Sequence, residues 1–130
     1  TDRYIYTAIA RAAVRGVDSQ WIRQLYGFAL APHLVFYLKI DADGLARRVL
    51  ETGGMEYWES GMDMKAGDDI YESFRTYQRA LLKEYAAMSD EFGFRVLDGR
   101  KSVNNIQEEL RRQVAEFLDG SGSPKLAGTE

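Results

Sequence analysis

The hydrophobic pattern at the start of the chain predicts two helices. The first, over residues 4–15, is rich in alanine, with Asp2 placed to cap it and Gly16 placed to end it. The second, over residues 19–30, carries apolar residues at helical spacing and has Asp18 as its N-cap. Both helices have a broad apolar face, so both are expected to pack against other parts of the fold.

An almost unbroken apolar run, LVFYLKI at residues 34–40, predicts a strand because it is short and contains β-branched and aromatic residues. A run without alternation is typical of a strand buried on both faces, as in the centre of a parallel sheet. The segment FRVLD at residues 94–98 predicts a second, shorter strand.

Three further helices are predicted around these strands. Asp43 can cap a helix that reaches residue 51, and apolar residues at steps of three or four predict the longest helix over residues 69–92. Ser102 can cap the last helix. The apolar residues of that last helix are expected to face inward: Val103, Ile106, Leu110, Val114 and Phe117.

Two stretches lack periodicity. Residues 55–69 combine acidic residues with glycines and are expected to form a surface loop or lid. Residues 119–130 are small and polar and are expected to form a flexible tail. The folded domain is therefore predicted to cover residues 1–118.

The order of these elements is that of an α/β fold, with a parallel sheet and flanking helices. A sheet of only two strands is marginal in water, and residues 34–40 are apolar enough to need neighbours on both sides. We therefore expect that strands preceding Thr1 are absent from this chain or are supplied by another one.

Composition and charge narrow the function classes. The 130 residues are 45% hydrophobic and 28% charged, which is ordinary for one soluble domain. There is no cysteine, which excludes disulfides and thiolate zinc sites. The net charge is −3, but residues 1–50 carry seven Lys/Arg against four Asp/Glu. This basic excess is too small for a nucleic-acid module and suits a small anion held in a pocket. No apolar run approaches the ~18–20 residues that span a bilayer, so we expect an intracellular protein without membrane contact.

Three segments together resemble a known family. The motif DRY at residues 2–4, the segment PHLVFYLKIDADGLARRVL and the segment RVLDGRKSVNNIQEEL are similar to the later half of thymidylate kinases. The resemblance covers residues 1 to about 118 and implies part of a P-loop NTPase-type sheet. It also implies a kinase that uses ATP and Mg²⁺ to phosphorylate a nucleoside monophosphate such as dTMP. No segment of the chain fits the phosphate-binding loop G-x-x-x-x-G-K-[ST].

The same resemblance implies an acceptor site around the DRY motif. Arg3 would approach the acceptor phosphate, and Asp2 would lie beside it near the metal and phosphates, so both are candidate catalytic residues. An arginine fork suits this role because it binds phosphate through two charge-assisted hydrogen bonds. Tyr4, Thr7 and Arg11 are the other candidate substrate-binding residues, although Arg11 departs from the family and could reach solvent instead. Without the resemblance, Asp2 is a helix cap and Arg3 a solvated charge.

A second candidate site, for ATP, lies after the second predicted strand. Gly99 and Arg100 follow its carboxyl end, where open α/β sheets collect ligands, and the resemblance implies that adenine lies against this turn. Either Arg48 or its neighbour Arg47 is a candidate for the donor phosphates, since no Lys or Arg lies between Arg48 and Lys65. A plain tight turn and a solvated helix face are the alternatives. No metal site made by protein ligands is predicted.

Two functions are compatible with these features. The first is a cytoplasmic, homodimeric thymidylate kinase-like enzyme, of which this chain is a part that lacks the phosphate-binding loop and is inactive alone. The second is a non-catalytic nucleotide-binding or oligomerisation module derived from the same family. Polyphosphate could also replace ATP as the donor, and nothing in the sequence selects it.

Overall fold

The computed structural model describes residues 1–52 and 70–120. The predicted lid at residues 55–69, and residues 121–130 of the predicted tail, lie outside this part of the chain. The elements follow in the order α1 (Ile5–Val14), α2 (Ser19–Leu25), β1 (Phe36–Lys39), α3 (Ala42–Thr52), α4 (Ile70–Phe92), β2 (Arg95–Asp98) and α5 (Val103–Leu118).

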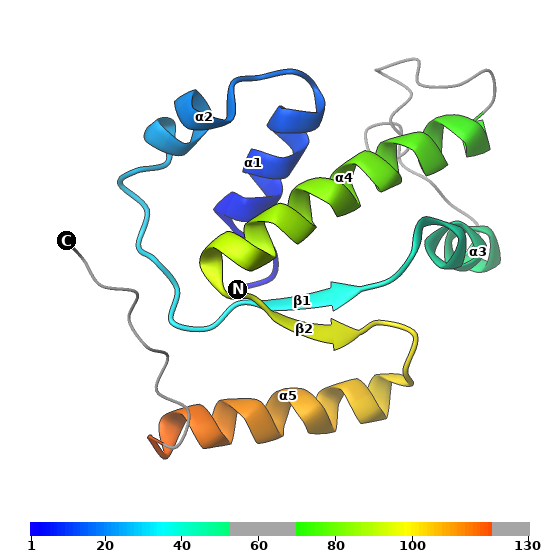
Figure 1. Cartoon of the computed structure of the whole chain (residues 1–130). Coiled ribbons are helices and arrows are strands. Elements are labelled where there is room, and N and C mark those ends of the chain that lie inside the picture. Colours follow the sequence, from blue (N-terminus) through cyan, green and yellow to red (C-terminus); the bar gives the residue numbers. More distant parts are fainter. Residues whose placement is uncertain (53–69, 121–130) are drawn as a thin grey trace.

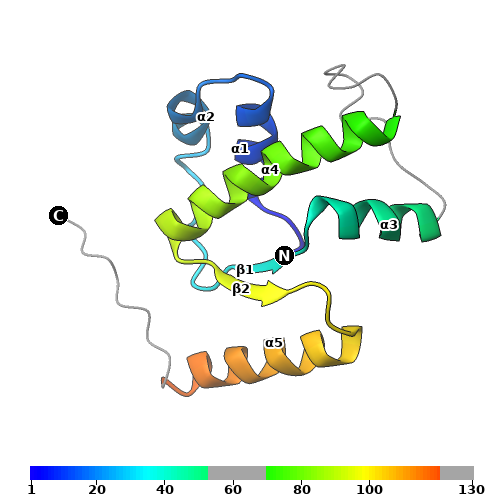
Figure 2. The same cartoon turned by 45° about the vertical axis from the view of Figure 1, so that its right-hand side comes forward.

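The two strands form a parallel sheet between layers of helices. β1 pairs with β2 so that Phe36 lies opposite Arg95 and Lys39 opposite Asp98. In both views α1, α2 and α4 lie on one face of this sheet and α5 lies on the other (Figure 1; Figure 2). α3 follows the end of β1, and α4 leads the chain back to the start of β2 (Figure 1). The predicted α/β class is therefore confirmed.

The hydrophobic core lies where α1 and α2 pack against α4. Its buried residues are Ile9, Ala10, Ile22, Tyr77, Leu81 and Met88. The alanines of α1 allow close helix packing, and Ala10 is completely buried. The hydroxyl of Tyr77 accepts a hydrogen bond of 3.0 Å from Arg15 Nη1, so this deeply buried polar atom is satisfied.

The longest helix is confirmed as α4, and most of its predicted apolar stripe is buried, although Phe92 at its end is 42% exposed. Phe74, Tyr77, Leu81 and Met88 are all buried, and Gly93 ends the helix in a left-handed conformation with φ +67°. Along residues 1–52 and 70–120, no helix combines the length and hydropathy needed to cross a membrane.

Two of the four predicted helix caps are confirmed, and two are wrong. Asp18 accepts from the N–H of Trp21 at 2.8 Å, and Ser102 caps α5 in the same way. The N-cap of α1 is Tyr4, without a side-chain cap, because a left-handed Arg3 turns the chain between Asp2 and the helix. At α3 the cap is Asp41, which accepts from the N–H of Gly44 at 2.5 Å. Asp43, the predicted cap, lies within the first turn.

Other expectations also need correction. The second helix ends at Leu25, not at residue 30, and successive turns follow it. β1 is not buried on both faces, because Leu38 is 50% exposed and Lys39 is exposed as well. Within the described chain β2 is the only strand that pairs with β1, so the other edge of β1 has no hydrogen bonds to a strand.

The predicted inner face of α5 also needs correction. The first and fourth apolar residues of this helix, Val103 and Val114, are exposed and do not face inward.

Candidate functional site

A cavity of about 980 Å³ lies between the first residues of the chain, α1, β1, α3 and α4. Its size suits a small organic ligand of the order of a nucleotide. The candidate acceptor residues all line it: Asp2, Arg3, Tyr4, Thr7 and Arg11. The structure therefore gathers these five predicted residues around one space.

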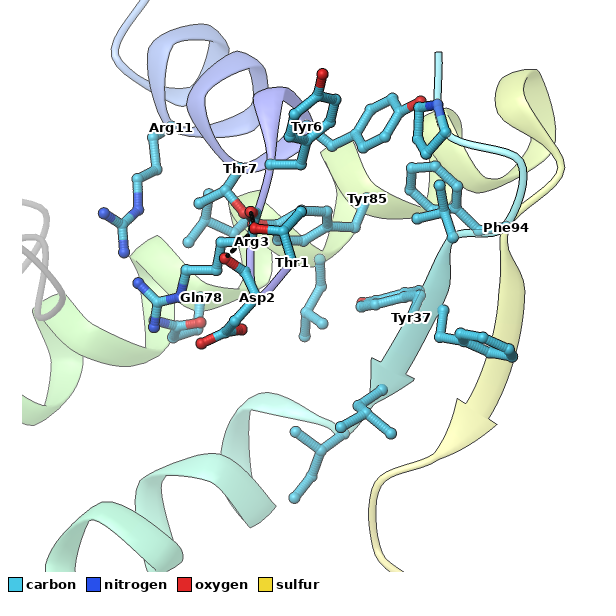
Figure 3. Close-up of a pocket in the computed structure, with 18 of the residues that line it drawn as sticks. Thr1, Asp2, Arg3, Tyr6, Thr7, Arg11, Tyr37, Gln78, Tyr85 and Phe94 are labelled. Atoms are coloured by element: carbon cyan, nitrogen blue, oxygen red, sulfur yellow. Dashed lines mark hydrogen bonds between the residues drawn. The ribbon is translucent and has the colours of Figure 1, made fainter. Parts of the chain in front are cut away.

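One side of the cavity is polar. Figure 3 shows Asp2, Arg3 and Arg11 on this side, together with Gln78 from α4. The backbone of Arg3 has φ +56°, a left-handed conformation that costs a non-glycine residue about 1–2 kcal/mol. Such conformations cluster at binding sites, where the side-chain direction matters more than local stability. The two guanidinium groups outweigh the single carboxylate of Asp2, so this wall has a net positive charge that favours an anionic ligand.

The periodicity of α1 places Thr7 and Arg11 on the same face, and Tyr4 is the N-cap of this helix. Tyr4, Thr7 and Arg11 follow one another at steps of three and four residues. The hydroxyl of Tyr4 donates to the backbone carbonyl of Leu30 at 2.9 Å, which ties the start of α1 to the chain before β1. The hydroxyl of Thr7 accepts from that of Tyr85 at 3.4 Å. Tyr4 and Thr7 thus both connect α1 to neighbouring walls of the cavity.

The opposite side of the cavity is aromatic. Figure 3 shows Tyr37 of β1 and Phe94 there, and the rings of Tyr37 and Tyr85 have centroids 5.4 Å apart. Burial is the main cause that raises the pKa of Tyr37, and the nearby Tyr85 adds to it. Burial also raises the pKa of Tyr6, whose ring packs 4.9 Å from that of Phe94. A neutral aromatic wall opposite two arginines suits a ligand with a planar apolar part and an anionic part.

The ATP candidates lie at a separate place, where the two strands end. A smaller pocket of about 480 Å³ is lined there by Arg100, with Lys39 and Asp41 among the other residues. Nε and Nη2 of Arg100 donate to the two carboxylate oxygens of Asp98, each at 2.9 Å. These hydrogen bonds, together with one from the backbone N–H of Arg100, lower the pKa of Asp98 from 3.8 to about 2.

Gly99 and Arg48 meet beside this pocket. Nη2 of Arg48 donates to the Gly99 carbonyl at 2.6 Å, and the N–H of Gly99 donates to the Lys39 carbonyl at 2.8 Å. The structure thus joins α3 to the turn after β2. The Arg48 and Arg100 side chains both bind protein groups here, which the sequence did not predict.

Several residues of the cavity were not predicted as site residues. Tyr37, Gln78, Tyr85 and Phe94 are among them. Gln78 had a signal in the sequence, since it follows Phe74 by four positions and so shares the inner face of α4. The tyrosines gave no such signal, because aromatic residues at helical or strand spacing are also typical of a core.

Candidate metal ligands are sparse. Within residues 1–52 and 70–120 there is no group of three or more His, Cys, Asp or Glu side chains that could hold a metal ion. Asp2 offers one carboxylate at the cavity. A single carboxylate fits an ion such as Mg²⁺ that is held largely by substrate phosphates and water.

Curated proteins with similar sequences are thymidylate kinases. Probable thymidylate kinase 2 of Saccharolobus solfataricus is 31% identical over 122 residues, which cover 92% of this chain and 57% of that protein. Probable thymidylate kinase of Methanocaldococcus jannaschii is 29% identical over 110 residues, covering 84% and 50%. Thymidylate kinase of Arabidopsis thaliana is 24% identical over 123 residues, covering 92% and 40%. No protein-family model matches the chain. The chain spans about half the length of the curated relatives it matches.

Proposed function

Because this chain is related to the thymidylate kinases, we propose that it is part of a nucleoside monophosphate kinase that transfers the γ-phosphoryl group of ATP to an acceptor such as dTMP. One observation carries the proposal. The DRY motif that resembles the family also lines a nucleotide-sized cavity, with Arg3, Thr7 and Arg11 on its wall. The motif and the cavity are independent observations that lead to the same residues.

In this proposal the polar side of the cavity holds the acceptor phosphate. Arg3 binds it through a bidentate, charge-assisted contact, and the left-handed backbone sets the direction in which this side chain leaves the main chain. Asp2 lies beside it, and Thr7 and Tyr4 contact the nucleoside. The aromatic side around Tyr37 packs against the base. Arg11 adds a second positive charge, which strengthens the attraction for an anionic acceptor.

The reaction needs positioning more than covalent chemistry. An oxygen of the acceptor phosphate forms a bond to the γ-phosphorus, the bond from that phosphorus to the β–γ bridging oxygen breaks, and ADP and a nucleoside diphosphate result. Mg²⁺, when bound, neutralises charge on the phosphate oxygens, and Asp2 is the residue of this chain that would face it. Gly99 and Arg100 would lie against the adenine of ATP at the strand ends.

The donor phosphates are assigned to protein outside these residues. Phosphate-binding loops use successive backbone N–H groups and a lysine, and the 130 residues contain no G-x-x-x-x-G-K-[ST]. Among residues 1–52 and 70–120, β1 pairs with a strand on one edge only, and a further strand that leads to such a loop would pair with its other edge.

An assay of the chain alone tests whether binding of the donor phosphates needs residues outside it. In a coupled assay of ADP formation with ATP, Mg²⁺ and dTMP, residues 1–130 are expected to give no turnover. Formation of ADP that depends on dTMP, above a heat-inactivated control, would refute the assignment of the donor phosphates to other residues.

A second candidate function is a non-catalytic nucleotide-binding or oligomerisation module. Arg48, the candidate for the donor phosphates, is bound to the Gly99 carbonyl, and Arg100, the candidate for the adenine, is bound to Asp98. If the module interpretation is correct, protein that includes a phosphate-binding loop will bind nucleotides and still transfer no phosphoryl group.

The remaining assignments concern assembly and extent. We propose a homodimer, because large apolar side chains in and after α2 are exposed: Trp21, Leu25, Phe28 and Leu30. We also propose that residues 1–118 form the domain and residues 119–130 a tail. A nucleotide kinase of this kind would work in the cytoplasm, where its substrates are found.

A further inference from the structure

Tyr4 lies at the turn that leads from the start of the chain into α1. The residue before it, Arg3, has a left-handed backbone with φ +56°, whereas Tyr4 itself is extended, with φ −146° and ψ −162°. The carbonyl of Tyr4 then accepts from the N–H of Thr7 at 3.1 Å, where the helix begins. The conformation of this turn sets the direction in which the Arg3 side chain leaves the main chain.

The hydroxyl of Tyr4 ties this turn to a distant segment. It donates to the Leu30 carbonyl at 2.9 Å, across 26 positions of sequence. Leu30 belongs to the segment between α2 and β1, and both residues line the cavity. By comparison, α1 has no side-chain cap, and the Thr1 hydroxyl reaches the Arg3 carbonyl oxygen only at 3.4 Å. The Tyr4 bond is the shorter of the two, and it joins the turn to another part of the fold.

A left-handed residue other than glycine needs such support. Right-handed and extended conformations of Arg3 are intrinsically lower in free energy, so the turn persists only where its surroundings hold it. When the Tyr4 hydroxyl loses the Leu30 carbonyl, the turn gains access to those conformations. The Arg3 guanidinium then spends less time at the polar side of the cavity, and it must lose more freedom when it binds an anion.

We propose, on the basis of the kinase function inferred above, that the hydroxyl of Tyr4 is a positioning group for Arg3. Its bond to the Leu30 carbonyl holds the left-handed turn, and this keeps the guanidinium in place for the acceptor phosphate. The ring and the hydroxyl of Tyr4 thereby have separate tasks. The ring contacts the nucleoside, whereas the hydroxyl acts on the phosphate only through Arg3.

This role differs from that of a simple anchor for α1. A hydroxyl that only anchors the helix supports every ligand of the cavity equally, with or without the arginine. A hydroxyl that positions Arg3 supports only ligands that carry a phosphate, and only while the guanidinium is present. The two roles therefore differ in which ligand loses affinity and in whether the loss depends on Arg3.

Calorimetry of dTMP and thymidine with the wild-type protein, Tyr4→Phe, Arg3→Met and the double variant tests this role. Tyr4→Phe removes the hydroxyl and keeps the ring, and it leaves no buried void because Tyr4 is 36% exposed. Tyr71→Phe is the matched control, because it removes the hydroxyl of an exposed tyrosine that does not line the cavity. Thermal unfolding followed by circular dichroism sets an assay temperature at which every variant is folded.

Tyr4→Phe is expected to weaken dTMP about three- to tenfold, the loss typical of one hydrogen bond, and to leave thymidine unchanged. In the Arg3→Met background the same change should not affect dTMP, and Tyr71→Phe should change neither ligand. An unchanged affinity of Tyr4→Phe for dTMP, an equal loss for both ligands, or an equal loss with and without Arg3 would overturn this role of Tyr4 and leave the proposed function standing. Wild-type protein that binds dTMP no more tightly than thymidine would instead overturn the proposed function.

Discussion

Gly99 gives a direct test of the packing at the strand ends. Replacing it with alanine would place a methyl group 3.0 Å from the Lys39 carbonyl oxygen and 3.4 Å from the carbonyl carbon. These atoms are backbone in a strand, so they cannot rotate away as a side chain would. The turn and β1 must separate by a few tenths of an ångström, which stretches the Gly99–Lys39 hydrogen bond of 2.8 Å.

Two opposing effects set the magnitude. Forcing one methyl group into a packed site costs about 1–3 kcal/mol. Alanine also restricts the unfolded chain, which stabilises the fold by about 0.4–1 kcal/mol where the backbone conformation is allowed. The steric cost is the larger, so the free energy of unfolding should fall by about 1–2 kcal/mol. For a domain of this size Tm should then fall by several degrees.

Gly93 provides a matched control with a different mechanism. A Cβ atom there meets nothing within 4 Å, but the backbone has φ +67°. Asparagine tolerates this conformation better than alanine does, so Gly93→Asn should be more stable than Gly93→Ala. At Gly99 space is limiting, and the order should reverse.

Thermal and urea unfolding of the four variants, followed by circular dichroism, supply both comparisons. A Gly99→Ala variant at least as stable as the wild type would refute the close approach of the turn to β1. The same order of alanine and asparagine at both sites would refute the distinction between space and backbone conformation.

Single substitutions in the core, at the strand-end ion pair and near α2 have distinct expected effects. Tyr77→Phe removes the 3.0 Å bond from Arg15 Nη1, which still donates to the Arg11 carbonyl at 3.2 Å, and should lower the free energy of unfolding by about 1 kcal/mol in urea; an unchanged free energy would contradict a stabilising role of this bond. Arg100 lowers the pKa of Asp98, so the pair stabilises the fold above pH 3.8, and this contribution is lost as the pH falls toward 2. Asp98→Asn should therefore be less stable than the wild type at pH 7 and converge with it near pH 2; a constant difference would contradict this. Phe28→Glu should convert a dimer to a monomer in sedimentation, since Phe28 is 85% exposed, and a monomeric wild type would exclude the dimer.

Several features that depend on neighbouring residues were predictable from the sequence, although the cap of α3 is Asp41 and not Asp43. The caps at Asp18 and Ser102 and the apolar stripe of α4 are of this kind, because a cap or a stripe is decided within one or two helical turns. The strand at residues 34–40 was found for the same reason, although only residues 36–39 form the ladder.

Features that depend on distant contacts were not predictable. The run LVFYLKI predicts a buried strand, but burial requires neighbours, and Leu38 has too few of them among the described residues. Asp2 fits the pattern of a cap, but the left-handed Arg3 separates it from α1. The bond from Arg48 to the Gly99 carbonyl joins residues 51 positions apart, and no local pattern encodes it.

The central claim is that Arg3 binds the phosphate of an acceptor nucleotide, and one calorimetric comparison tests it most directly. The affinities of dTMP and thymidine are measured for the wild-type protein, for Arg3→Met and for the control Arg79→Met, which removes an exposed arginine that does not line the cavity. Arg3→Met should weaken dTMP about tenfold or more and leave thymidine unchanged, while the control should change neither. An unchanged affinity for dTMP, or an equal loss for dTMP and thymidine, would contradict the claim.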